Sequence, residues 1–343
     1  MALPIPVPGR VPDEQESLAK RAAGYYIPAP NQKQVQTQYN DGGIPMEISL
    51  AGWSIHRRFR DSESPLLLLD FPALAVEEFD IRLLELNSPF FAYADPDNPA
   101  TSRLAAGYLI ELRQRARDSG VQLLNVAVDG HGDLASPDNK ERKQAVDNHK
   151  KWIDACLALG CNAFRANTGP GRGESVTETH IGKCIESFGE LTELCAQAGI
   201  RLLMENHGGV SVSPENILRV MEAVGSDHCR VLADFLNWPA EDDKLENLRM
   251  VAPYAWATHA KFLSFTADGE SREIDCAAAI GILKDAGYDN PFGIEYEGKT
   301  DDREGVLKSK ALLEKHARTF ELRSNCTNDE TRNLTLMRNS SGK

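Results

Sequence analysis

Four residues in the second half of the chain have side chains that can bind a metal, and each stands at the end of a short apolar run. They are Glu205 in RLLMENHGG, Asp234 in RVLADFLNW, His259 in AWATHAKF and Glu295 in PFGIEYEG. Each run is followed by turn or polar residues, as expected of a buried strand that ends in a charged side chain. Burying such a side chain is costly unless something compensates its charge. The four recur at intervals of 25 to 36 residues, which indicates a repeated structural unit. It also suggests that one group neutralises the charges of all four, and a divalent metal ion is the first candidate.

The ligand types indicate which ion such a site prefers. Two glutamates, one aspartate and a single imidazole make an oxygen-rich set, which favours one Mn²⁺ or Mg²⁺ ion and also accepts Co²⁺ or Zn²⁺. A closed structural zinc site prefers Cys and His, so that kind of site is not indicated. The alternative is a buried ion-pair network in which Arg165 and Lys261 neutralise the carboxylates, and Glu297 could substitute for Glu295.

The elements that position these residues alternate along the chain. Apolar strands are predicted at Met46–Trp53, Ile81–Leu86, Gln122–Val128, Ala163–Asn167, Arg201–Glu205, Arg230–Asp234, Ala255–Lys261 and Phe292–Glu295. Helices are predicted at Ala73–Glu78, Ser102–Ser119, Lys140–Ala158, Glu174–Ala198, Pro214–Val224, Leu245–Val251, Cys276–Ala286 and Arg303–Arg318. Eight such units predict an α/β fold, a single (β/α)₈ TIM barrel. A doubly wound open sheet is the competing architecture, but it rarely needs eight units, and no Gly-x-Gly-x-x-Gly follows the first strand.

The two ends of the chain differ in composition from the part between them. The barrel, as the metal-dependent catalytic domain, is predicted over residues 46–320. Residues 1–45 are rich in Pro and Gln and contain one short helical candidate at Glu14–Ala23, so we interpret them as an N-terminal extension. Residues 321–343 are polar, and a disordered C-terminal tail is predicted there.

Further polar residues share the inward parity of the predicted strands. In a parallel barrel, side chains of one parity point inward, and those nearest the C-terminal end line the mouth. Glu205 and His207 share this parity on the fifth strand, and His259 and Lys261 share it on the seventh. The fourth and eighth strands add Arg165, Asn167 and Glu297. Polar groups from at least five strands are thus expected at one mouth.

These motifs resemble the xylose isomerase-like TIM barrel superfamily, in its sugar phosphate isomerase/epimerase group. The resemblance covers about Met46–Arg318 and rests on the ordered Glu, Asp, His and Glu and on the strings MENHGG, ADFLN, HAKF and IEYEG. The opening strand LAGWSIH, with Trp53, is also similar to that group. The resemblance implies one divalent metal held by Glu205, Asp234, His259 and Glu295. It further implies that the first and last glutamates double as acid–base groups.

The implied chemistry takes place at a carbon next to a carbonyl. A bound ion polarises the carbonyl of a ketose or oxo-sugar and acidifies the adjacent C–H. An ionised Glu205 or Glu295 then abstracts the proton, and Lys261 and the metal stabilise the resulting enediolate. Return of the proton on the other face is epimerisation, and return to the neighbouring carbon is isomerisation. The expected substrate contacts are Arg165, Asn167, Asn237 and Trp53.

One position departs from the family pattern. Sugar 3-epimerases of this group commonly carry a His three residues after the metal-binding Asp, whereas this chain has Asn237 there. Asn can hydrogen-bond a hydroxyl but cannot carry a proton, which argues against a simple ketose epimerase. His207 and Lys261 offer titratable groups instead and are the further catalytic candidates. His131 and His56, in loops after the third and first strands, are weaker candidates.

The leading hypothesis is therefore a divalent-metal-dependent sugar isomerase or epimerase. The alternative is a metal-dependent lyase or dehydratase that expels a β-leaving group from an oxo-sugar or oxo-glycoside, because its first step is the same. An endonuclease IV-like nuclease would need more His ligands and a basic rim. A non-catalytic binding protein would leave the four metal-binding residues without a role.

Composition limits the partners and the compartment. The 343 residues carry a net charge of −13 and no long basic run, so nucleic-acid binding is not expected. No apolar stretch approaches the length of about 18 residues that a membrane span requires. Seven scattered cysteines without a Cys-x-x-Cys pair indicate reduced thiols and a cytoplasmic location. A small carbohydrate is the expected partner, and the family resemblance allows a homo-oligomer.

Overall fold

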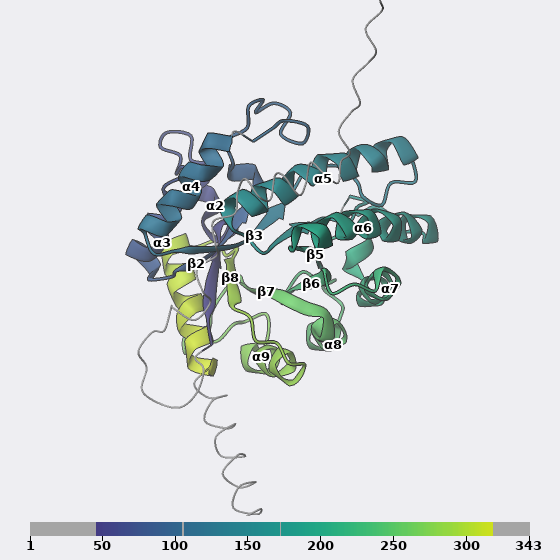
Figure 1. The fold of residues 1–343 in the computed structure, drawn as a ribbon. Coiled ribbons are helices and arrows are strands. Elements are labelled where there is room, and N and C mark those ends of the chain that lie inside the picture. Colours follow the sequence, from purple (N-terminus) through teal and green to yellow (C-terminus); the bar gives the residue numbers. More distant parts are fainter. Residues whose placement is uncertain (1–45, 105, 172, 318–343) are drawn as a thin grey trace, which may run out of the picture. The chain divides into compact units, whose positions relative to one another are not determined.

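The computed structural model describes residues 46–317, apart from residues 105 and 172. Eight parallel strands form a closed barrel in sequence order, and β1 pairs with both β2 and β8 (Figure 1). This confirms the single barrel predicted from the sequence. The strands are β1 (Ile48–Ala51), β2 (Leu83–Asn87), β3 (Gln122–Val128), β4 (Ala163–Ala166), β5 (Arg201–Glu205), β6 (Cys229–Asp234), β7 (Ala255–Phe262) and β8 (Phe292–Tyr296).

Helices connect the strands and lie outside the ring that the strands form (Figure 1). The α-helices with both ends described are α2 (His56–Phe59), α3 (Phe71–Phe79), α4 (Ala106–Asp118), α5 (Asn139–Leu159), α6 (Glu178–Ala198), α7 (Pro214–Val224), α8 (Lys244–Val251) and α9 (Cys276–Asp285). Residues 302–317 are also helical. Short 3₁₀ helices occur at η1 (Gly52–Ile55), η2 (Ser88–Phe90), η3 (Gly209–Val212) and η4 (Ala252–Tyr254).

The first strand is shorter than predicted. It ends at Ala51, and Trp53 lies in η1 rather than on the strand. The turn is held by Ser54, whose Oγ donates a hydrogen bond to the carbonyl oxygen of Ile294 and accepts one from the backbone N–H of Tyr296, both at 3.0 Å. These bonds tie η1 to β8 and take the chain out of the sheet before Trp53.

Helix α6 begins at Glu178, four residues later than the predicted Glu174. Thr177 is its N-cap and forms a capping box with His180. The Thr177 hydroxyl accepts from the backbone N–H of His180, while His180 Nδ1 accepts from the backbone N–H of Thr177 at 3.0 Å. These bonds satisfy N–H groups that a helix end leaves without partners, so the helix starts at this point.

Several predictions lie outside the described residues, namely the extension over residues 1–45, its helical candidate and the tail over residues 321–343. Cys326 lies there as well, whereas the six cysteines in the described part of the chain are buried free thiols. Among the described helices, none combines the length and the apolar character needed to cross a membrane.

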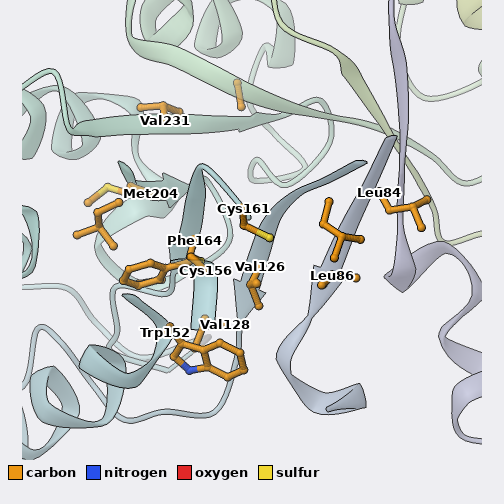
Figure 2. Packing of buried hydrophobic residues seen from close by; sticks show 14 of the residues in the cluster. Leu84, Leu86, Val126, Val128, Trp152, Cys156, Cys161, Phe164, Met204 and Val231 are labelled. Atoms are coloured by element: carbon orange, nitrogen blue, oxygen red, sulfur yellow. The ribbon is translucent and has the colours of Figure 1, made fainter. Parts of the chain in front are cut away.

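Alternate residues along the strands face two environments. Leu84, Phe164 and Met204 point outward into a large apolar core between strands and helices, where Trp152 of α5 also packs (Figure 2). A smaller apolar cluster lies on the opposite parity, inside the barrel, and consists of Ala163, Leu203, Leu232 and Ala257. Each of these stands two positions before one of the polar residues Arg165, Glu205, Asp234 and His259. Those four therefore share the inward face and lie nearer the C-terminal mouth.

Gly293 on β8 leaves space inside the barrel for the side chain of Glu85 on β2. A Cβ atom at position 293 would overlap Oε1 of Glu85 and would lie 2.6 Å from the carbonyl oxygen of Thr258. Backbone cannot yield easily within a closed barrel, so only glycine fits here without displacing the carboxylate.

We predict that Gly293→Ala lowers the free energy of unfolding by about 1–3 kcal/mol, the usual cost of overpacking. Urea denaturation of both proteins measures this. The matched control is Gly182→Ala in α6, where no atom lies within 4 Å of the added Cβ; it should leave stability equal or raise it by up to about 1 kcal/mol. Equal stability of Gly293→Ala and the parent protein would contradict the close contact.

Candidate metal centre

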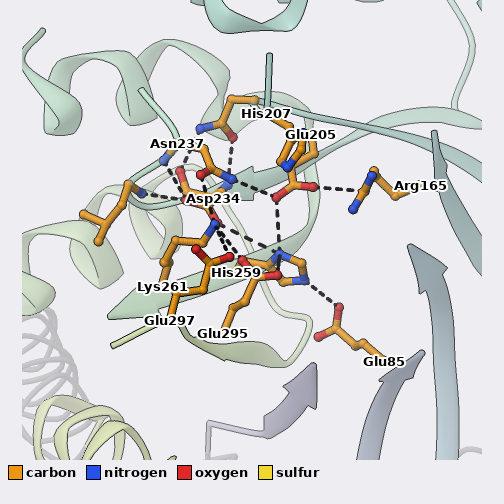
Figure 3. Close-up of polar contacts among 12 residues, drawn as sticks. Glu85, Arg165, Glu205, His207, Asp234, Asn237, His259, Lys261, Glu295 and Glu297 are labelled. Atoms are coloured by element: carbon orange, nitrogen blue, oxygen red, sulfur yellow. Dashed lines mark hydrogen bonds and ion pairs between the residues drawn. The ribbon is translucent and has the colours of Figure 1, made fainter. Parts of the chain in front are cut away.

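The structure brings together the four residues that the sequence singled out. Their ligand atoms, contributed by the consecutive strands β5 to β8, all lie within 4.8 Å of one another (Figure 3). All four side chains are buried, with exposed fractions of 0% to 5%. We call them the quartet: Glu205, Asp234, His259 and Glu295.

His259 lies at the centre of the quartet. Its Nδ1 atom is 3.4 Å from Glu205 Oε1, 3.4 Å from Glu295 Oε1 and 4.0 Å from Asp234 Oδ2. Neighbouring ligands around one ion, with bonds of about 2.1 Å, lie about 3–4 Å apart. The spacing of the quartet atoms is close to that range.

One buried atom of each quartet side chain makes no hydrogen bond to any other described residue. These atoms are Glu205 Oε2, Asp234 Oδ2, His259 Nδ1 and Glu295 Oε2. The three oxygens do lie 2.8 to 3.3 Å from nitrogens of Arg165 or Lys261, within ion-pair distance. Buried polar atoms are nearly always hydrogen-bonded, so four such atoms in one cluster fit a bound cation.

The buried charges of the cluster do not balance. The buried carboxylates at this site are Glu85, Glu205, Asp234 and Glu295. The buried side chains with a permanent positive charge are Arg165 and Lys261. With a neutral imidazole, two negative charges remain in excess, and a buried excess of this kind is costly. A single divalent cation would neutralise it.

The carboxylates also raise the proton affinity of the cluster. Burial alone lowers the pKa of His259, but Glu295, Glu205 and Glu85 raise it well above its usual value. For Asp234, burial raises the pKa to about 7 against the opposing charge of Lys261, with neighbouring carboxylates adding to the rise. The protein side chains alone therefore hold protons near neutral pH that a metal ion would have to displace.

Both glutamates of the quartet are ionised. Burial would raise the pKa of Glu205, but the charge of Arg165 outweighs it and, with His259 and His207, lowers the pKa to about 2. Burial is likewise outweighed at Glu295, where His259 and Lys261 lower the pKa well below its usual value. His207 is part-buried just after β5, and its charge acts on Glu205.

Lys261 is held between three carboxylates. Its Nζ atom lies 2.8 Å from Glu295 Oε2, 3.3 Å from Asp234 Oδ2 and 3.3 Å from Glu297 Oε1. Burial lowers the pKa of Lys261, but these carboxylates raise it well above its usual value. The ion pairs that the sequence left as the alternative to a metal are therefore present, but they do not balance the charge of the quartet.

Asn237 connects three residues of the site. Its Nδ2 donates to Glu205 Oε1 at 3.1 Å, and its Oδ1 accepts from Lys261 Nζ at 2.9 Å. Its backbone N–H donates to Asp234 Oδ1 at 2.8 Å. The side-chain amide of Asn237 thus links Glu205 to Lys261. Because the backbone N–H of Asn237 occupies Oδ1 of Asp234, Oδ2 is left for the other ligands.

Arg165 and Asn167 share a partner that the sequence reasoning missed. Arg165 Nη1 donates to Asp129 Oδ1 and to Asn167 Oδ1, both at 2.7 Å. Asn167 Nδ2 donates to the same Asp129 oxygen at 2.8 Å. Asp129 directly follows β3, and together the three residues fix the guanidinium beside Glu205.

Two other candidates make their contacts elsewhere. Trp53 stacks on His56 and Phe90, with ring centroids 5.1 and 5.9 Å apart. His131 is buried against Trp152, and burial lowers its pKa to about 4. His131 is therefore a neutral ring in the packing of the third loop, and the substrate contact predicted for Trp53 stays a prediction.

Glu85 is the principal residue that the sequence reasoning missed. Its Oε2 lies 3.3 Å from Nε2 of His259 (Figure 3). The signal for it was present, because Glu85 stands between Leu84 and Leu86 in an apolar strand and so has the inward parity. Its distance in sequence from the quartet hid the connection.

Comparison with solved structures shows the same fold in several enzymes. An L-ribulose 3-epimerase is 19% identical, with a TM-score of 0.64 over 81% of this chain and 98% of that one. The probable 3-DHS dehydratase AsbF from Bacillus anthracis is 14% identical, with a TM-score of 0.58 over 78% and 98%. A xylose isomerase-like TIM barrel protein from Mycobacterium smegmatis, solved in complex with magnesium, is 14% identical, with a TM-score of 0.59 over 80% and 96%.

The sequence itself matches one family model. Among curated proteins no sequence matches this chain. The model of the xylose isomerase-like TIM barrel matches residues 82–316, which is more than half of the chain and includes all four residues of the quartet. The chain therefore belongs to the xylose isomerase-like TIM barrel family.

Proposed function

We propose that this protein is a divalent-metal-dependent sugar isomerase or epimerase with a small carbohydrate substrate. The observation that carries the proposal is the buried quartet, because together with the neighbouring Glu85 its carboxylates exceed the positive charges of Arg165 and Lys261 by two, which fits one divalent ion. Oxygen-rich ligands favour Mn²⁺ or Mg²⁺, with Co²⁺ or Zn²⁺ as further candidates. The buried free thiols of the described cysteines support a reducing, cytoplasmic location.

Glu205 and Glu295 are the proposed acid–base pair. A bound ion would act as a Lewis acid toward a substrate carbonyl and so acidify the neighbouring C–H. Glu205, which Arg165 keeps ionised, accepts that proton. A carboxylate with a pKa of about 2 is a weak base, so the transfer depends on that acidification. Glu295, on the strand that follows His259, is the proposed second proton-transfer group; because it is ionised, it would take up a proton from solvent before returning one to the substrate.

The residues around this pair fix its geometry and charge. Lys261, held by Glu295 and Glu297, supplies positive charge for an enediolate intermediate. Asn237 holds Glu205 and Lys261 at a set distance from each other. Arg165, Asn167 and Trp53 are the proposed substrate contacts, and His207 is a further proposed catalytic group.

A lyase or dehydratase is the second candidate. It needs the same ionised glutamate for its first step, and it differs only in expelling a β-leaving group from the intermediate. Two observations favour keeping it: Asn237 stands where sugar 3-epimerases commonly carry a His, and one protein of the same fold is a probable dehydratase. A nuclease is not favoured, since the quartet has one His and the chain has a net charge of −13.

The central prediction concerns deuterium exchange. The metal-loaded protein should incorporate deuterium from D₂O at a carbon next to the carbonyl of one member of a panel of ketoses and oxo-glycosides. Glu205→Gln should lower this exchange about 10²–10⁴-fold, because an amide can still offer a ligand oxygen but accepts no proton. Mass spectrometry of the sugars measures the exchange, and an unsaturated product would assign the lyase reaction instead.

The control for this experiment is Glu111→Gln on the exposed surface of α4, which removes a carboxylate that pairs with Arg115. It should exchange at the parent rate. Parent-like exchange in Glu205→Gln would show that Glu205 is not the base. Failure of the parent protein to bind any divalent ion would remove the whole proposal.

A second prediction follows from the raised pKa of His259. Because an ion must displace the proton on its ring and the proton that Asp234 partly holds near neutral pH, Mn²⁺ binding should weaken as the pH falls and should release roughly one to two protons per ion. Calorimetric titration in two buffers with different protonation enthalpies counts the protons released. His259→Ala should weaken binding and lower the number of protons released per ion. Binding that is independent of pH, without proton release, would contradict this account.

A further inference from the structure

Glu85 is buried inside the barrel, and two of its polar neighbours donate hydrogen bonds to its carboxylate. Its exposed fraction is 3%. Oε1 accepts from the hydroxyl of Ser49 at 2.6 Å, and Oε2 accepts from the amide nitrogen of Asn125 at 2.8 Å. A carboxylate that is surrounded by donors requires the third neighbour, His259 Nε2 at 3.3 Å, to carry a hydrogen as well.

This contact determines how His259 faces the quartet. A neutral imidazole has one N–H and one lone pair. With the hydrogen on Nε2, the lone pair lies on Nδ1, and Nδ1 is the atom that lies 3.4 Å from Glu205 and from Glu295. Figure 3 shows the His259 ring with Glu85 on one side and the carboxylates of the quartet on the other.

We propose that Glu85 is a positioning residue that holds the hydrogen of His259 on Nε2 and so presents Nδ1 to the metal. The inference rests on the metal site proposed above. Carboxylates that accept from a ligating His commonly set its tautomer and orientation, and their removal costs about 10–100-fold in metal affinity. A merely structural role for Glu85 is the alternative, since Ser49 and Asn125 alone could account for a buried carboxylate.

Two substitutions separate these roles. In Glu85→Gln, the amide oxygen can accept from Asn125 and His259, while the amide nitrogen can donate to the Ser49 hydroxyl, so the tautomer is kept and only the charge is lost. In Glu85→Met, a side chain of similar length offers His259 no comparable acceptor. The matched control is Ser49→Ala, which removes a hydrogen bond from the same carboxylate but leaves its Oε2–Nε2 contact in place.

The first measurement is calorimetric titration of the full chain with Mn²⁺ alone. Glu85→Met should bind about 10–100-fold more weakly than the parent protein, with Glu85→Gln between the two and Ser49→Ala within about threefold of the parent. Circular dichroism and urea unfolding report whether each variant is folded. Parent-like Mn²⁺ affinity in folded Glu85→Met would overturn the proposal.

The second measurement does not depend on any variant folding. The parent protein is labelled with ¹⁵N-histidine and loaded with diamagnetic Zn²⁺, and two-bond ¹H–¹⁵N correlations identify which nitrogen of His259 carries the hydrogen. We expect a protonated Nε2 and a Zn²⁺-bound Nδ1. Zn²⁺ on Nε2 would overturn the inference about Glu85 while leaving the metal site intact, whereas an absence of Zn²⁺ and Mn²⁺ binding would instead remove the proposed function.

Discussion

The charge balance inside the barrel mouth is the constraint on which the site depends. Buried carboxylates outnumber the buried permanent cations by two, and the folded chain must meet this excess with protons or with a metal ion. The raised pKa values of His259 and Asp234 show where the protons go. An arrangement that served stability alone would pair each acid with a base. The excess is therefore better explained as a cation site than as an ion-pair network.

The parallel barrel can hold these buried charges because the two faces of each strand lie in different environments. Outward residues build the apolar core with the helices, so the inward positions near the C-terminal mouth are free to carry charge. Small residues then decide where long polar side chains fit. Gly293 on β8 leaves room for Glu85 on β2, with only β1 between the two strands. Ala163 and Ala257 stand two positions before Arg165 and His259 on the inward face of their strands.

The barrel and the quartet could be predicted because both follow from patterns among residues that are close together in the sequence. Alternating apolar runs gave the eight strands, and each quartet residue ends one of them. Glu85 carries the same strand signal, but its partner lies 174 residues away, and only the closed ring of strands brings them together. The linking role of Asn237 could not be foreseen either, since it depends on the turn in which Asp234 Oδ1 accepts the N–H groups of residues 236 and 237.

In the proposed reaction, whether the intermediate is reprotonated or loses a group depends on which residue can supply a proton. Lys261 is a titratable candidate by its position in the sequence, but the carboxylates around it raise its pKa well above its usual value, which fits the proposed role of a positive charge better than that of a proton donor. Asn237 carries no proton. His207 is a titratable side chain beside Glu205 that is not a quartet ligand, and its charge contributes to the lowered pKa of that carboxylate. In the proposed reaction, the outcome would then depend on Glu205 and His207 on the β5 side of the mouth together with Glu295 on β8.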